Sequence, residues 1–237
     1  MIAFLKLIIY TPLYNLLVFL LSISWIDAGI AAILLTIFVK TILYPLAKKS
    51  IITQIKMREK GGELNKIKEK YKDKQVQALK IMEFYKENNI NPFSSIGILL
   101  IQIPILYSLY YIFFKSGLPV VDAEILYSFV KMPSEVSMNF LGFVDVSQKS
   151  IVLALLAGVS TFYQMHLSTQ NTPEIPTNTG DKPDFSKIMM KQMKYTLPVV
   201  VFFISSQIAG VVPLYWFASN IIGTAQDYYV KRQLKNK

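Results

Sequence analysis

The feature that most constrains the fold is a run of about 20 residues, from Ala28 to Ala47, in which Lys40 is the single charged side chain. As an α-helix this run would rise about 30 Å, which matches the hydrocarbon core of a bilayer. In addition, 53% of the 237 residues are hydrophobic, a composition too apolar for a soluble domain of this size. The chain is therefore predicted to be an all-α polytopic membrane protein.

Four further apolar segments complete a prediction of five transmembrane helices, which occupy residues 26–47, 92–114, 150–168 and, as two helices, 191–230. The stretch 48–91 holds twelve Lys or Arg against six Asp or Glu, whereas 115–149 holds three against four. Because basic residues collect in cytoplasmic loops, 48–91 is predicted to be cytoplasmic and 115–149 external. In a multi-pass protein of the cell membrane, the N-terminus would then lie outside and the basic tail 231–237 in the cytoplasm.

The N-terminal segment 1–25 is apolar enough to resemble a signal peptide or a sixth span. Its only early charge is Lys6, no small-residue cleavage site follows, and Thr11-Pro12 interrupts it. If it crossed the bilayer, the next span would run outward and would place the basic loop outside. An interfacial helix on the outer leaflet is therefore favoured, with a membrane span as the alternative.

The cytoplasmic segment 48–91 carries apolar residues at spacings of three and four in a charged background, which is typical of amphipathic helices. We predict a helical hairpin with its reversal at "YKDK", residues 71–74, and a break at "EKGGE", residues 59–63. A solvated spacer is the alternative. Because acids alternate with the bases and no aromatic platform accompanies them, no nucleic-acid partner is expected. The Pro-, Thr- and Asn-rich stretch 169–190 is predicted to be a flexible cytoplasmic loop.

The sequence contains no recognisable catalytic or metal-binding motif. It has no cysteine, no Walker-type loop and no HExxH, and the sole histidine, His166, has no partner at metal spacing. Ser160 and His166 faintly suggest an intramembrane serine protease, but a nucleophile and its base converge from different helices and no second histidine exists. We therefore expect a protein that is not an enzyme and that binds neither a cofactor nor a metal.

Five short motifs resemble, in order and spacing, the signatures of the YidC-type membrane protein insertase family; they are "TIFVKTILYPLAKKS", "KIKEKYKDK", "FYKENNINPF", "LLIQIPILYSLYY" and "PLYWFASNIIGTAQDYY". The resemblance covers most of residues 28–230. It implies a five-span core with the N-terminus outside, a cytoplasmic hairpin, and a hydrophilic groove open to the cytoplasm and to lipid but closed toward the outside.

The function implied by the resemblance is the insertion and folding of client transmembrane segments. Its partners would be nascent membrane proteins and anionic lipids, with the ribosome and the Sec translocon as further candidates, and a monomer is expected to suffice. The family usually has Arg where this chain has Lys40, and a Pro-containing segment where it has Gly61-Gly62. The C-terminal tail is short, so a ribosome-docking extension is expected to be missing.

By the resemblance, six residues are candidates for the groove and client-binding site: Thr36, Lys40, Gln102, Tyr215, Trp216 and Asn220. Thr36 and Lys40 are four residues apart and so share one helical face. A lone amide such as Gln102 could instead form an interhelical hydrogen bond, and the aromatic side chains could instead form an interfacial belt. Gln164 and Gln207 are weaker candidates.

The hypothesis for Lys40 is a positive electrostatic anchor in a wet groove, because a charge at that depth costs about 2.5 to 3.5 kcal/mol on insertion scales. Snorkelling of the ammonium to the head groups is the alternative. Two other functions remain open. An ion or small-solute transporter that uses Lys40 predicts a through-going cavity and further intramembrane carboxylates, which the predicted spans lack. A purely structural assembly subunit predicts no water in the groove.

Overall fold

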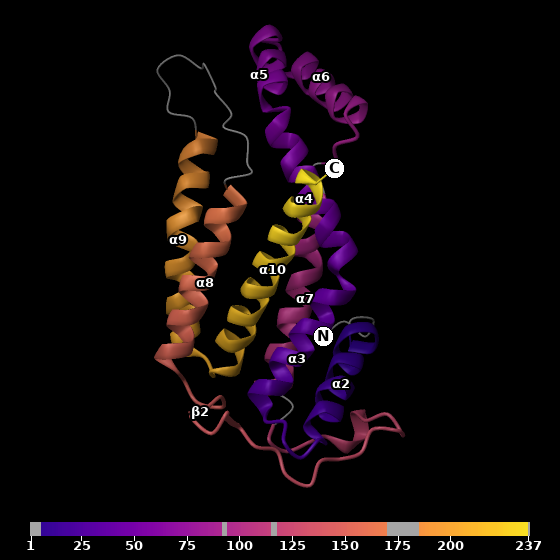
Figure 1. Ribbon diagram of the computed structural model, residues 1–237, viewed down its shortest axis with the longest axis vertical. Coiled ribbons are helices and arrows are strands. Elements are labelled where there is room, and N and C mark those ends of the chain that lie inside the picture. Colours follow the sequence, from indigo (N-terminus) through magenta and orange to yellow (C-terminus); the bar gives the residue numbers. More distant parts are fainter. Residues whose placement is uncertain (1–5, 92–93, 115–117, 170–184, 237) are drawn as a thin grey trace.

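The computed structural model describes residues 6–91, 94–114, 118–169 and 185–236, and these are mostly helical (Figure 1). The loop predicted to be flexible lies for the most part outside the described residues. In chain order the elements are η1 (Lys6–Tyr10, π-helical), α2 (Thr11–Leu21), α3 (Ala28–Ile42), α4 (Tyr44–Glu59), α5 (Gly61–Lys70), α6 (Lys74–Glu87), α7 (Ser94–Phe114), η2 (Ala123–Ile125, 3-10), β1 (Asn139–Phe140), β2 (Val144–Asp145), α8 (Ile151–Thr169), α9 (Phe185–Gln207) and α10 (Val211–Lys235).

The first predicted span is not one straight helix. The α3 helix ends at Ile42, α4 begins at Tyr44, and the two axes differ by 63°. Pro45 has no N–H to donate, and its ring clashes with the carbonyl four residues earlier, at Thr41, so the helix cannot continue straight. The prediction of a continuous helix from Ala28 to Ala47 is therefore wrong. Instead, α4 runs on to Glu59, into the segment predicted as the hairpin.

The ends of the last two helices also differ from the sequence-based boundaries. The α9 helix begins at Phe185, inside the predicted loop 169–190, and α10 continues to Lys235, so most of the predicted tail 231–237 is helical. The last turns of α10 are held by contacts, because Lys48 of α4 donates to Gln233 at 2.9 Å. Tested for length and hydropathy, none of the described helices qualifies by itself as a membrane span, whereas the bent α3–α4 pair does.

The helices pack side by side in a fixed order, with α9 on α8, α8 on α10, and α10 on α3 (Figure 1). At the end of this bundle near β2, one apolar core joins side chains of α2, α3, α7 and α10, among them the fully buried Tyr14, Leu17, Leu35 and Ile112. At the opposite end, α5 and α6 form a hairpin that reverses at residues 71–73 and has its own small core of Leu64, Phe84 and Ile90.

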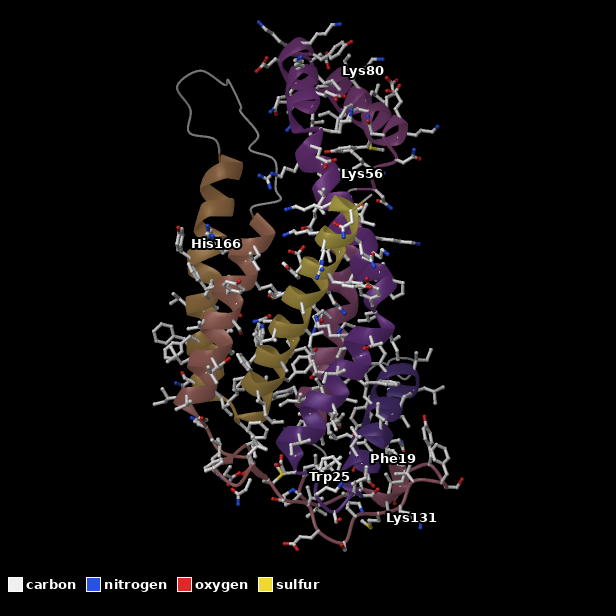
Figure 2. All side chains as sticks on the ribbon, in the orientation of Figure 1. Phe19, Trp25, Lys56, Lys80, Lys131 and His166 are labelled. Carbon is white, nitrogen blue, oxygen red and sulfur yellow. The ribbon has the colours of Figure 1, made fainter. Side chains whose placement is uncertain are left out.

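The N-terminal helix α2 is tied to the loop that follows α7. Asn15 is 2% exposed, donates to the carbonyl of Ile125 at 2.9 Å and accepts from the N–H of Tyr127 at 2.6 Å. The hydroxyl of Tyr14 accepts from the N–H of Asp122 at 2.7 Å. The opposite face of α2 remains exposed at Phe19 (Figure 2). One face of α2 thus belongs to the bundle core, and the other is exposed.

Candidate functional site

A polar cavity of about 140 Å³ lies where α3, α4, α8 and α10 meet. Its lining residues come from the end of α3, the first half of α4, the end of α8 and the second half of α10: Lys40, Ala47, Ser50, Ile51, Gln54, Gln164, Leu167, Gly223, Thr224, Gln226 and Asp227. Most of these side chains carry a polar atom. The cavity can therefore hold water or a polar segment of another chain.

Lys40 supplies the charge of this cavity. It lies in the last turn of α3 and is half-buried. Within the described parts of the chain, no carboxylate lies within ion-pair distance of its ammonium. The one lining carboxylate, Asp227, is paired instead with Lys231 one turn further along α10. Lys40 is therefore a positive charge without an ion-pair partner among the described residues of the cavity wall.

Glutamine side chains form much of the remaining wall. Gln226 Nε2 donates to the backbone carbonyl of Lys40 at 3.0 Å, and Gln54 Nε2 donates to Ser50 Oγ at 3.3 Å. The amide of Gln164 lies against Gly223, where a Cβ atom would meet Gln164 Nε2 at 2.5 Å. Glycine at position 223 therefore lets the α8 glutamine approach the α10 backbone.

The cavity and the apolar core occupy different levels of the same helices. Val211–Tyr215 at the start of α10 pack in the core, whereas residues 223–227 line the cavity, about 18 Å further along the helix axis. On α3 the core residues run from Ala28 to Val39, and Lys40, directly after them, lines the cavity. The bundle is thus apolar toward the end near β2 and more polar toward the end that carries the hairpin.

Comparison with known proteins identifies the family. Residues 19–237 match the family described as 60Kd inner membrane protein. The chain belongs to the YidC-type family of membrane protein insertases. An insertase YidC of Clostridium tetani is 33% identical over 206 residues, which cover 86% of this chain and 81% of that one.

Two further YidC relatives differ in length. The Fusobacterium nucleatum protein is 31% identical over 229 residues, covering 95% of this chain and 98% of that protein. The Francisella philomiragia protein is 33% identical over 205 residues, which are 86% of this chain but 32% of that longer protein. As a YidC-family member, the protein is a protein of the cell membrane.

Of the six residues predicted to form the insertase groove, Lys40 lines the cavity. Thr36 lies one turn earlier on α3, is 1% exposed and donates to the carbonyl of Ala32 at 2.6 Å, so its hydroxyl is used within its own helix. Trp216 is half-buried on α10 and is not among the lining residues. Gln164, a weaker candidate, does line the cavity, whereas Gln207 is exposed at the end of α9.

The other three predicted residues form hydrogen bonds between helices. Gln102 of α7 donates to the hydroxyl of Tyr215, which is 4% exposed on α10. Asn220 of α10 donates to Ser160 Oγ at 3.0 Å and to Thr161 Oγ1 at 2.8 Å, both on α8. The structure thus brings Gln102 together with Tyr215, and separates both, as well as Asn220, from the cavity lining.

Sequence reasoning missed five polar residues that line the cavity of this insertase: Ser50, Gln54, Thr224, Gln226 and Asp227. A signal for the last three was available. The stretch "GTAQD" at 223–227 gathers three polar side chains, and two of them, Thr224 and Asp227, are three residues apart and so lie on one face of a helix. Ser50 and Gln54 are four residues apart on α4 and also share one face, although their charged surroundings made them resemble an ordinary solvated face.

Proposed function

We propose that this membrane protein insertase uses the Lys40 cavity as a transient polar binding site. The site would bind the hydrophilic part of a client while that part crosses the membrane. The observation that carries the proposal is Lys40, which lines a cavity with mostly polar side chains and has no ion-pair partner among the described residues of its wall. Such a site attracts carboxylates of a client and offers water and amide partners to its backbone.

The physical basis is the cost of moving polar groups through hydrocarbon. Each unpaired polar group in the bilayer core costs several kcal/mol. A hydrated cavity within the bundle shortens the distance over which the client has no polar partner. The apolar part of the client then partitions into lipid, which gains about 0.8 kcal/mol per buried CH₂ group. No chemical step is needed, so the protein is a membrane chaperone and not an enzyme.

The proposed topology has the bent α3–α4 pair, α7, α8, α9 and α10 as five membrane segments, with the N-terminus outside and the α5–α6 hairpin in the cytoplasm. The charge distribution supports this orientation. Lys56 and Lys80 lie toward the hairpin end, whereas Trp25 lies at the opposite end (Figure 2). Basic residues favour the cytoplasmic side and Trp favours an interface.

In this orientation the polar cavity opens toward the cytoplasm, and the apolar core separates it from the outside. The hairpin is placed to receive nascent membrane proteins, and the basic residues at its base are placed near anionic lipids. The ribosome and the Sec translocon are proposed as further partners, and a monomer contains the whole cavity.

Insertion by the purified full-length protein in liposomes tests the proposal, with two clients whose translocated segments differ only in carrying acidic or neutral residues. Unit charges about 8 Å apart attract by about 2 kcal/mol at an effective dielectric constant of about 20. Lys40→Ala should therefore slow the acidic client by up to about thirtyfold and the neutral client much less. Lys40→Arg should retain insertion and Lys40→Glu should be slowest.

Lys131→Ala is the matched control, because Lys131 is an exposed lysine of the loop at the opposite end of the bundle. It should insert both clients at the parental rate. If a folded Lys40→Leu variant inserts the acidic client as fast as the parent, the ammonium is not an anchor and the proposal fails.

A further inference from the structure

The break between α3 and α4 releases backbone carbonyls beside the cavity. The hydrogen-bond ladder of α3 ends where the N–H of Leu43 donates to the carbonyl of Val39 at 3.0 Å. The carbonyls of Lys40 and Thr41 follow this last bond, and Pro45 has no N–H to offer to Thr41. A carbonyl left without a donor inside a membrane protein costs free energy, so an outside donor is needed.

For Lys40 this donor comes from another helix. Gln226 of α10 is half-buried and places Nε2 3.0 Å from the carbonyl oxygen of Lys40. It is one of three residues on one face of α10, spaced three and four apart, that contact the chain before and after the bend. Tyr229 has its ring centroid 6.4 Å from that of Tyr44, just after the break, and Gln233 accepts from Lys48, one turn further, at 2.9 Å.

One face of α10 therefore runs along both sides of the bend, and Gln226 is its contact on the α3 side. The last turn of a helix frays readily, because its carbonyls lack intrahelical donors. Rotation of that turn would carry the Lys40 side chain away from the cavity. A hydrogen bond to the carbonyl of Lys40 itself opposes this rotation at the residue that bears the charge.

We propose that Gln226 is a positioning residue for insertion: its side-chain amide caps the Lys40 carbonyl that the α3–α4 break releases, and so holds the Lys40 ammonium in the cavity. The proposal rests on the proposed role of Lys40 as the cavity's anchor. Because Gln226 acts through Lys40, its removal should matter for acidic clients and should have no effect once Lys40 is gone.

The hydrogen bond can be measured directly, because the sequence contains a single Lys-Thr step, at Lys40-Thr41. Labelling with carbonyl-¹³C lysine and ¹⁵N threonine therefore gives one carbonyl–nitrogen correlation in solid-state NMR of the full-length protein in bilayers. Gln226→Met, which removes the donor at similar length, should move the Lys40 carbonyl signal upfield. Thr224→Val, a loss of polarity on the same helix and in the same cavity, should leave the signal in place.

An unchanged signal in folded Gln226→Met overturns the capping contact. Gln226→Ala, which removes the donor without a long side chain, decides the question in the same way if the methionine variant does not fold. Folding is checked for each variant by circular dichroism and thermal unfolding.

Insertion assays then test the positioning role. Gln226→Met should slow the acidic client severalfold and leave the neutral client near the parental rate, and it should add no loss in a Lys40→Ala background. If Gln226→Met inserts the acidic client at the parental rate although Lys40→Ala is slow, the positioning role is overturned and the proposed function stands. If Lys40→Ala itself inserts the acidic client at the parental rate, the proposed function fails, whatever the carbonyl signal shows.

Discussion

A substitution at Asn220 can distinguish a structural role of this residue from client binding. Its side chain forms two hydrogen bonds to α8, which a structural role would require. Both acceptors, Ser160 Oγ and Thr161 Oγ1, also donate to the carbonyl of Ala157, at 3.0 and 2.7 Å. Replacing Asn220 therefore removes two interhelical hydrogen bonds without leaving either hydroxyl donor unpaired. Hydrogen bonds between membrane helices contribute about 0.6 kcal/mol on average and about 1.7 at most. Asn220→Leu should therefore destabilise the fold by about 1 to 3 kcal/mol.

Equilibrium unfolding in mixed micelles with increasing sodium dodecyl sulfate, followed by tryptophan fluorescence, measures this loss. Ile221→Ala is the matched control, because Ile221 is the next residue on α10 and is 49% exposed; its effect should be small. A photo-crosslinker at position 220 should trap α8 and not a client. Unchanged stability of Asn220→Leu, together with client trapping at position 220, would refute the structural role and favour client binding.

Two further predictions concern the end of the bundle opposite the hairpin. A Cβ at Gly29 would lie 2.3 Å from the Phe140 ring. Gly29→Ala should therefore destabilise the fold by about 1 to 3 kcal/mol through overpacking and lower the melting temperature. Phe140→Ala in the same chain should relieve this loss, and a double variant no more stable than Gly29→Ala would contradict the steric origin. Asn15→Leu leaves the Ile125 carbonyl and the Tyr127 N–H without their side-chain partner. The loss of each bond should cost about 1 kcal/mol, and hydrogen exchange at Tyr127 should accelerate. Parental protection of that amide would show that α2 does not hold the loop.

The broad organisation of this protein could be read from its sequence, because it follows from local patterns. Long apolar runs with few charges predict helices of membrane length, and the contrast between the basic segment 48–91 and the balanced segment 115–149 predicts their orientation. The helix break at Lys60 and the reversal at 71–73 lie where Gly61-Gly62 and "YKDK" stand. Five motifs in order were enough to indicate the family that the comparisons identify.

The bend at Leu43 was accessible to the same local reasoning and was nevertheless missed. Pro45 is visible in the sequence, but the apolar run continues across it to Ala47, so hydropathy favoured a single helix over the break that proline imposes. The end of α10 differs for another reason, since the contact of Lys48 with Gln233 supports helix in a segment whose composition resembles a tail.

Only the tertiary structure decided which polar side chains share the cavity. Helical periodicity determines which residues lie on one face of a helix, but not which face of which other helix meets it. Gln102 and Tyr215 are 113 residues apart, and Gln226 and Lys40 are 186 apart. Such contacts depend on how two helices pack against each other: Gly223, for example, leaves room for Gln164 of α8 beside the α10 backbone, and the carbonyl of Lys40 at the end of α3 accepts from Gln226 of α10. A polar side chain in an apolar helix needs a hydrogen-bond partner. Helix packing determines whether it finds that partner on another helix or instead lines the cavity.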